Sequence, residues 1–359
     1  MATLNIENMK NFFTGKKILV TGHTGFKGGW LSKILIELGA EVTGLSLPPR
    51  EDSFFKSMNL KDQIHHFEDD IRDFRAVQSV FDQSEPEIVF HLAAQALVQR
   101  SYHEPLETLS TNIIGSSNIL EATKRSAGVR ACVYITSDKC YLNREWVWGY
   151  RETDQLGGHD PYSASKAAAE LVFESYLKSF FAERENFACA SARAGNVIGG
   201  GDWSDNRLVP DCVRSINKGI TIELKKPDAT RPWQHVLEPL SGYLLLGQKL
   251  FEDGKKFNGS WNFGPQAANV KTVGELVNAL LLEYGMDHRV ELKSEKDKFY
   301  ESNLLQLNCD KANILLGWTP RWDFQTCIKH TVDWYKAPDA EHRNIVTENQ
   351  INSYFSEAG

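Results

Sequence analysis

Two short stretches of the chain carry side chains that can move protons. The first, "YITSDKCY" (134–141), begins as an apolar strand and ends in Ser137, Asp138 and Lys139. A carboxylic acid beside an amine can supply an acid and a base to one substrate, whereas a simple ion pair would only end the strand. Because neighbours on a strand point to opposite faces, both side chains reach one substrate only if the backbone leaves extended geometry near Ser137.

The second stretch, "PYSASKAAAEL" (161–171), places Tyr162 and Lys166 four residues apart, on one face of a helix. An ammonium beside a phenol lowers the phenol pKa from about 10 toward neutrality. Such a phenolate can take the proton from a sugar hydroxyl while hydride leaves to a nicotinamide. Chance alone gives a chain with 11 tyrosines roughly one such pair, but this pair follows the fifth strand, with Ser137 25 residues upstream.

A glycine-rich turn, "VTGHTGFKGGWL" (20–31), follows the first apolar strand and opens a helix. Glycines let backbone N–H groups approach a pyrophosphate, and the helix N-terminus favours the anion. Close helix packing is the alternative use of such a turn. We predict that it binds a dinucleotide through Gly22, His23, Thr24, Gly25, Phe26, Lys27 and Gly28.

The choice between NAD and NADP stays open in the sequence. The acidic residue that usually holds the adenosine ribose about 20 positions on is absent, and Ser46 and Arg50 stand nearby instead. Arg50 or Lys27 would meet a 2′-phosphate. In "DDIRD", Asp70 and Ile71 would flank the adenine, unless Asp70 serves only as a helix N-terminal charge.

Elements that position these groups alternate along the first 195 residues. Apolar runs at 17–21, 41–47, 87–93, 131–137 and 187–193 alternate with helical patterns at 28–39, 73–83, 105–127 and 161–183. This alternation predicts an α/β fold with a doubly wound parallel sheet. We expect a dinucleotide-binding domain over 1–195, a smaller mixed α/β substrate region over 196–340, and a polar tail over 341–359 that frays.

Composition excludes several classes of function. A net charge of −7 gives no electrostatic reason to bind nucleic acid. No apolar run of about 18 residues and no signal-peptide core occurs, so we expect a cytoplasmic protein with no membrane partner. The six cysteines form no C-x-x-C pair and are predicted to be free thiols, and no histidine spacing predicts a metal site.

The chain resembles the extended short-chain dehydrogenase/reductases that act on nucleotide sugars. The resemblance covers roughly residues 15–335 and is carried by "TGHTGFKG", "HLAAQALV", "STNIIGSSNIL" with Asn112, "ITSDK", "YSASK" and "RAGNVIGGGDW". Within that superfamily, "GHTGFKGGWL", "TSDKCY" and "RPWQHVLEPLSGYL" are most similar to the CDP-glucose 4,6-dehydratases. This resemblance implies a Rossmann-type domain with tightly held NAD and a C-terminal nucleotide-sugar region. It also implies assembly into a homodimer or a dimer of dimers, and a role in deoxysugar and O-antigen synthesis.

The reaction implied by the resemblance explains why acid and base would sit beside Tyr162. Tyr162 takes the C4 hydroxyl proton while the C4 hydride passes to NAD. A base then removes the C5 proton, an acid helps the C6 hydroxyl leave as water, and the hydride returns to C6. The family pattern makes Ser137, Asp138, Lys139, Tyr162 and Lys166 catalytic.

Further contacts follow from the same pattern. Leu92, Ala93, Ala94 and Thr136 would contact the cofactor, although Thr136 and Ser137 both compete for the C4 oxygen. Asn112 is expected to make a structural bond, and Arg193 either a structural one or a ligand contact. The predicted substrate contacts are Gln95, Asn196, Arg207, Arg231, His235 and Tyr300, with Trp203 a weaker candidate.

The roles of Asp138 and Lys139 stay interchangeable at this point. Related dTDP-glucose dehydratases place an Asp–Glu pair here, which would make Asp138 the acid and Lys139 the base. Reference pKa values instead favour the ion pair by roughly 9 kcal/mol in water, which reverses the roles, and burial narrows that gap.

Other functions stay open too. An NDP-sugar 4-epimerase would need neither Asp138 nor Lys139, and a silent dinucleotide sensor would not need to keep Ser137, Tyr162 and Lys166. A dehydratase acting on a dTDP- or GDP-sugar would share the whole pattern.

Overall fold

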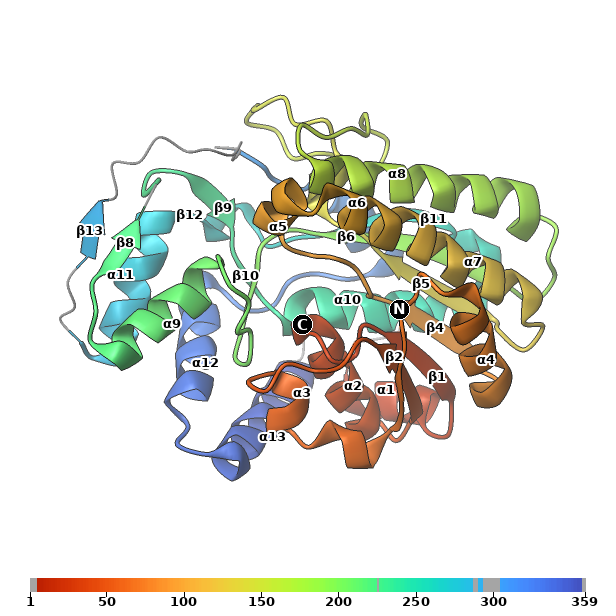
Figure 1. The fold of residues 1–359 in the computed structure, drawn as a ribbon, viewed down its shortest axis with the longest axis horizontal. Helices are drawn as coiled ribbons and strands as arrows, with labels where there is room; N and C mark the ends of the chain where they lie inside the picture. Colours follow the sequence, from red (N-terminus) through yellow and green to blue (C-terminus); the bar gives the residue numbers. More distant parts are fainter. Residues whose placement is uncertain (1–4, 225, 287–289, 293–303, 357–359) are drawn as a thin grey trace.

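The structure is a computed structural model that describes residues 5–224, 226–286, 290–292 and 304–356. Within them, seven parallel strands form one sheet in the order β11-β6-β5-β4-β1-β2-β3 (Figure 1). The strand order reverses between β1 and β4. Open α/β sheets bind their ligands at the carboxyl ends of the strands beside such a reversal. The strands are β1 (Lys17–Thr21), β2 (Glu41–Ser46), β3 (His65–Glu68), β4 (Ile88–His91), β5 (Ala131–Ile135), β6 (Ala188–Ala194) and β11 (Gly259–Phe263).

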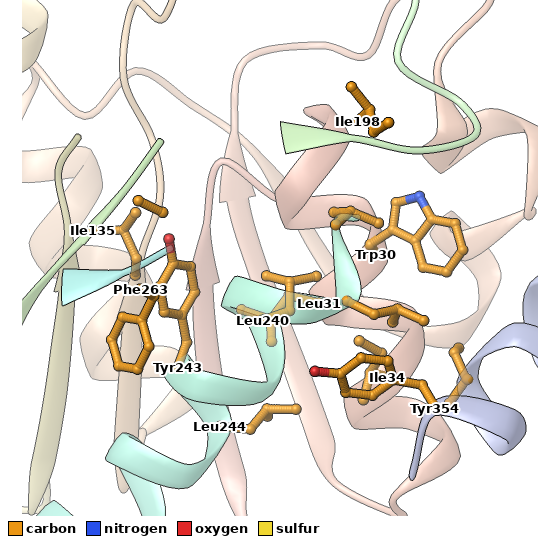
Figure 2. Close-up of a cluster of buried hydrophobic side chains, with 14 of the residues drawn as sticks. Trp30, Leu31, Ile34, Ile135, Ile198, Leu240, Tyr243, Leu244, Phe263 and Tyr354 are labelled. Atoms are coloured by element: carbon orange, nitrogen blue, oxygen red, sulfur yellow. The ribbon is translucent and has the colours of Figure 1, made fainter. Parts of the chain in front are cut away.

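Both faces of the sheet are buried, which explains its nearly continuous apolar strands. In β1, Ile18 and Val20 enter one core cluster, while Leu19 enters the cluster on the opposite face. One face carries α4 (Phe74–Ser84), α7 (Ser116–Arg125) and α8 (Pro161–Tyr176), and the other carries α1 (Ile6–Phe13), α2 (Phe26–Glu37), α3 (Phe54–Ser57) and α10 (Leu237–Asp253). Figure 2 shows Leu240 and Leu244 of α10 facing side chains of α2 in this second layer. The predicted doubly wound α/β fold is confirmed.

The helical segments that follow β4 and β5 contain π-helical turns. The first begins with α5 (Val98–His103), which the non-helical Glu104 separates from α6 (Pro105–Leu109), η2 (Ser110–Gly115) and α7. The second continues from α8 into η4 (Leu177–Phe181). Such turns often accompany functional sites, and η2 carries Asn112, which bonds to the loop after β4.

A smaller region follows β6 and lies beside the sheet, at the left in Figure 1. Three two-stranded sheets build it, and they pair β7 (Val197–Ile198) with β10 (Gln234–His235), β9 (Thr230–Pro232) with β12 (Val270–Thr272), and β8 (Ile222–Leu224) with β13 (Val290–Leu292). Its helices are α9 (Leu208–Lys218), α11 (Val273–Tyr284) and α12 (Phe324–Lys336). The short turns of the chain are η1 (Leu60–Gln63), η3 (Asp138–Cys140), η5 (Gly254–Phe257), η6 (Ala267–Asn269) and η7 (Ala312–Leu316).

Two expectations about domain organisation differ from the structure. The first domain does not end at residue 195, because β11 and α10 come later in the chain and complete the sheet and its cover. The prediction of a fraying tail is wrong, because α13 (Ala340–Ser356) is a packed helix. Its Tyr354 and Phe355 are fully buried, and the Tyr354 hydroxyl donates to Glu238 Oε2 at 2.6 Å.

Three negative findings concern the described residues. All six cysteines are free thiols, five of them buried. No helix in the described part of the chain has the length and apolar character to cross a bilayer. No group of three or more potential ligands in the same residues is arranged to hold a metal ion.

Candidate active site

The end of β5 turns sharply and gathers the predicted acid–base residues. Ser137 is still extended, with φ −163° and ψ 157°, and it caps the single 3-10 turn η3. Its Oγ accepts from the Lys139 N–H at 3.2 Å and donates to Asp138 Oδ1 at 2.9 Å. The backbone therefore leaves extended geometry directly after Ser137. This turn is what Asp138 and Lys139 need if both are to reach one substrate.

Asp138 is a buried carboxyl group with one unpartnered oxygen. It is 4% exposed, and its Oδ2 has no hydrogen-bond partner among the described residues. Gly195 lies against that oxygen, since a Cβ at Gly195 would lie 3.2 Å from it. Burial raises the pKa of Asp138, while the charge of Lys139 and the Ser137 hydrogen bond oppose the rise. The site thus narrows the free-energy gap between the neutral Asp138–Lys139 pair and the corresponding ion pair.

Tyr162 and Lys166 project from the first two turns of α8 and are both buried. Burial raises the pKa of Tyr162 to about 12, and a hydrogen bond with the Ser137 side chain opposes the rise. Burial also lowers the pKa of Lys166 to about 8. The expected depression of the phenol pKa by Lys166 is absent in the protein by itself, because burial penalises both charged forms.

A buried ion pair beneath this site was not found by the sequence analysis. Glu170 lies one turn after Lys166 on α8, and Arg193 Nε and Nη2 donate to its two oxygens at 2.9 and 2.8 Å. Thr136 donates its hydroxyl to the same carboxylate. Because its hydroxyl is committed to Glu170, Thr136 is corrected from a cofactor or C4-oxygen contact to a support of this ion pair. Ser137 remains the candidate for the C4 oxygen. The pairing with Glu170 makes Arg193 structural. The four-residue spacing from Tyr162 to Lys166 to Glu170 is the signal that could have revealed the pair.

The loop after β4 is held by amide side chains. Asn112 donates to Gln95 O at 3.0 Å and to Ser165 Oγ at 2.9 Å, and it accepts from Gln95 N at 2.8 Å. Its expected structural role is confirmed. The Gln95 amide itself bonds to Leu97 and Thr108 within the protein. This corrects Gln95 from a substrate contact to a loop support, because its polar atoms are already engaged.

The glycine-rich turn forms a cradle that admits no side chains at two positions. Gly22 has φ +75°, and a Cβ there would lie 2.7 Å from Ala93 N. A Cβ at Gly28 would lie 2.1 Å from Gly22 O. The turn therefore packs directly on the loop of Leu92 and Ala93, with the α2 N-terminus alongside. These residues fit the pyrophosphate of a dinucleotide.

Side chains around this cradle bear on the choice of dinucleotide. Arg50 donates to Asp52 and to Asp205, each at 3.1 Å, so its charge is already matched by two carboxylates. Thr24 bonds to Ser46 Oγ at 2.7 Å and so ties the turn to the end of β2. This pairing of Arg50 gives a 2′-phosphate no free cation at that position and favours NAD.

Lys27 lies in the first turn of α2, among charged groups. Its pKa is lowered to about 8 by burial and by the charges of Arg207 and Lys166, and it is raised by Asp138 and Asp202. Lys27 therefore interacts electrostatically with residues of the acid–base site. Its predicted contact with the cofactor stays a prediction.

Three other predicted cofactor residues have side-chain contacts within the protein. The His23 ring bonds to His66 at 2.7 Å and fills the space over Gly44, so only the His23 backbone faces the cradle. The Asp70 carboxylate accepts from Arg72 Nε at 2.9 Å. Ile71 is 4% exposed and packs in the core against the helix that contains η2. The contacts of these residues with the cofactor stay a prediction.

Asn196, Arg207 and Arg231 stay predicted substrate contacts. Asn196 adjoins Gly195, and Arg207 pairs with Asp202 at 3.1 Å while its charge acts on Tyr162 and Lys27. Arg231 is nearly buried on β9.

His235 is corrected to a core residue. It is fully buried, with its ring 4.9 Å from that of Trp322. Trp203 packs edge-on against Tyr335. Tyr300 lies outside the described residues.

Comparison with known proteins agrees with this geometry. The family model described as GDP-mannose 4,6 dehydratase matches residues 19–331. The chain belongs to this family. A curated CDP-glucose 4,6-dehydratase from Salmonella typhimurium is 47% identical over 353 residues, which cover 97% of this chain and 98% of the relative.

Solved structures of nucleotide-sugar epimerases share the fold with this member of the GDP-mannose 4,6 dehydratase family. The UDP-glucose 4-epimerase from Thermotoga maritima, solved with UDP-glucose, superposes with a TM-score of 0.78 at 26% identity and covers 89% of this chain and 98% of its own. The Thermus thermophilus UDP-glucose 4-epimerase, solved with NAD, has a TM-score of 0.74 at 26% identity and covers 89% and 99%.

Proposed function

We propose that the chain is an NAD-dependent CDP-glucose 4,6-dehydratase, a lyase that makes CDP-4-keto-6-deoxyglucose. The observation that carries the proposal is the η3 turn, which holds Asp138 beside Ser137 and in electrostatic contact with Tyr162. Oxidation at C4 uses Ser137 and Tyr162, whereas Asp138 and Lys139 are needed only for the loss of water. The relative that is 47% identical has the same named activity.

The oxidation uses groups on β5 and α8. NAD, when bound, accepts hydride from C4 and returns it to C6. Ser137 holds the C4 oxygen, and Tyr162 takes its proton. Lys166 lies one turn along α8 from Tyr162 and supplies positive charge beneath the cofactor site. Gly22, Gly25, Gly28, Leu92, Ala93 and Ala94 would hold the dinucleotide mainly through backbone groups.

The elimination uses the η3 turn. Once C4 is a ketone, the C5 proton is acidic and the C6 hydroxyl must leave with a proton. Burial raises the pKa of Asp138 and so favours its neutral form, which can donate to the leaving hydroxyl while Lys139 removes the C5 proton. Asn196, Arg207 and Arg231 are proposed to hold the nucleotide diphosphate, since guanidinium groups suit phosphate oxygens.

A substrate comparison tests the proposal. Purified protein is incubated with CDP-, dTDP- and GDP-sugars, and the 4-keto product is followed by its absorbance in alkali. The proposal expects product from CDP-glucose in preference to the others. A 4-epimerase would release only the C4 epimer, and a silent dinucleotide sensor would release nothing, so either result overturns the proposal.

Two variants then test the acid and base assignment. We expect Lys139→Met to keep slow NADH formation and to lose exchange of the C5 proton with solvent deuterium. Unchanged exchange in Lys139→Met removes Lys139 as the base. If Asp138→Asn alone abolishes the exchange, the roles are reversed.

Assembly into a homodimer or a dimer of dimers is part of the proposal. Large apolar side chains are exposed where α6, η2 and α8 lie together, with Leu106 80%, Ile114 56% and Leu171 57% exposed (Figure 1). A second copy of this chain would cover them. Ile114→Glu should shift the sedimentation coefficient toward the monomer, while Leu282→Glu, at a still more exposed position on α11, should not.

The cellular setting is proposed on chemical grounds. Six free thiols suit a reducing compartment such as the cytoplasm. The product is an activated 6-deoxy ketosugar, which suits the synthesis of deoxysugars for surface polysaccharides such as O-antigen.

A further inference from the structure

Helix α10 approaches the sheet closely because two glycines face it. A Cβ at Gly242 would lie 2.3 Å from the Phe263 ring, and a Cβ at Gly247 would lie 2.8 Å from the Phe90 ring. The far end of α10 lies at the start of β5, since Arg130 Nη2 donates to Phe251 O at 3.3 Å. Helix α10 therefore runs opposite to β5, and its first half lies toward the catalytic end of the strands.

Tyr243 occupies that first half, between the two glycines. Side chains on a helix lean toward its N-terminus, so the Tyr243 ring leans toward the carboxyl end of β5. Figure 2 shows its hydroxyl pointing away from α10 toward Ile135, the last residue of β5. The ring packs edge-on against Phe263 at 5.6 Å, the residue is 0% exposed, and its hydroxyl has no hydrogen-bond partner among the described residues.

Two unpartnered polar atoms thus belong to residues at the end of β5 or facing it. Asp138 Oδ2 is the other, three residues beyond Ile135. Each buried polar atom without a partner costs free energy, so such an atom calls for an explanation. Burial raises the pKa of Tyr243, and the charge of Asp138 raises it further. The two groups therefore interact electrostatically.

Several elements bring titratable or polar groups to bear on Asp138. They are Lys27 on α2, Ser137, Lys139 and Cys140 at the η3 turn, Tyr162 on α8, and Tyr243 on α10. The Ser137 hydroxyl serves Oδ1. Tyr243 stands out in this group because its neutral hydroxyl is an uncommitted donor that interacts electrostatically with Asp138.

We infer that Tyr243 is a positioning residue for the elimination. Its hydroxyl donates a hydrogen bond to Asp138 Oδ2 when that carboxyl group is ionised. The bond forms after a small carboxylate rotation or through one bridging water. It stabilises the carboxylate against burial and so sets the pH at which Asp138 takes up or releases its proton. The inference rests on the proposed dehydratase activity.

The test is Tyr243→Phe, which removes one oxygen and keeps the ring. A hydrogen bond to the charged form lowers a pKa, so its loss raises the pKa of Asp138. The limb of the pH profile for C5 deuterium exchange that reports Asp138 should move upward by about one to two pH units. NADH formation at C4 should keep its pH profile. Tyr243→Met, which also lacks the hydroxyl, should give the same shift.

Controls separate this role from packing. Tyr284→Phe removes another buried, unpartnered hydroxyl on α11, away from the site, and should leave both profiles unchanged. If the exchange profile of Tyr243→Phe superimposes on that of the wild type, or if oxidation and exchange fall together, Tyr243 only packs and the inference is wrong. If the wild type makes no 4-keto product, the proposed function fails and the inference falls with it.

Discussion

At the scale of single residues, burial decides the chemistry of the site more than charge pairing does. Tyr162, Lys166 and Asp138 all have pKa values moved toward their neutral forms, with burial as the largest cause. The exception is the ion pair beneath them. Burial alone would raise the pKa of Glu170, but Arg193 and three hydrogen bonds hold it below its usual range. The ion pair beneath the site therefore stays charged, while burial moves the pKa values of the reacting groups above it toward their neutral forms.

This contrast predicts a large effect of changing Arg193. Arg193→Met leaves Glu170 buried without its partner, which should lower the free energy of unfolding by about 3–5 kcal/mol. Lys178→Met breaks the exposed pair with Glu174 and should cost less than about 1 kcal/mol. Denaturant unfolding of both variants measures the difference, and equal losses would contradict the prediction.

At the scale of elements, the site depends on how closely backbones approach one another. The glycine-rich turn contacts the loop after β4 without any intervening side chain, and α10 approaches the sheet through Gly242 and Gly247. The cofactor helix α2 is also held from behind, because Lys33 Nζ donates to Glu348 of α13 at 2.9 Å. Helices near both ends of the chain thus support the same crevice.

Gly28→Ala tests the close approach at the turn. The new Cβ would lie 2.1 Å from a backbone carbonyl, so the turn must move and NAD affinity should fall by about 100-fold or more, equivalent to ~2.8 kcal/mol. Gly128→Ala is the matched control, because its Cβ would meet its nearest atom at 4.0 Å. Calorimetric titration with NAD gives both affinities, and an unchanged value for Gly28→Ala would refute the cradle.

Helix α13 supplies a second test at this scale. Tyr354→Ala removes a fully buried ring and its hydrogen bonds to Glu238 and Ser241, and it should lower the free energy of unfolding by about 3–5 kcal/mol. Asn352→Ala, on the exposed face of the same helix, should stay within about 0.5 kcal/mol of the wild type. A frayed tail would instead make both changes neutral.

At the scale of the whole molecule, buried neutral histidines make the fold sensitive to acid. Burial lowers the pKa of His23 and of His91 to about 3, and it lowers the pKa of His235 well below its usual value. The unfolded chain binds these protons below about pH 6.5, while the folded chain does not. The stability that these neutral histidines contribute is therefore fully present above about pH 6.5 and is lost progressively as the pH falls below it.

His91→Gln should make this pH dependence shallower. Each buried histidine contributes up to about 1.4 kcal/mol per pH unit between pH 6.5 and 5, and the variant lacks one of them. Denaturant unfolding at several pH values measures the slope. The same change at the exposed His65 serves as the control, and identical slopes for the wild type and His91→Gln would contradict the prediction.

The sequence by itself determined which residues could carry the chemistry. Local spacing encodes the glycine turn after β1, the placement of Ser137, Asp138 and Lys139 at a strand end, and the shared helix face of Tyr162 and Lys166. These features depend on neighbours along the chain, so periodicity and motif spacing reveal them.

The tertiary structure alone decided the surroundings of those residues. It placed His235 in the core, assigned Thr136 to Glu170, packed α13 against the sheet domain and brought Tyr243 near Asp138. Burial and partner choice come from segments far apart in the sequence, and they set the pKa values on which the proposed elimination depends.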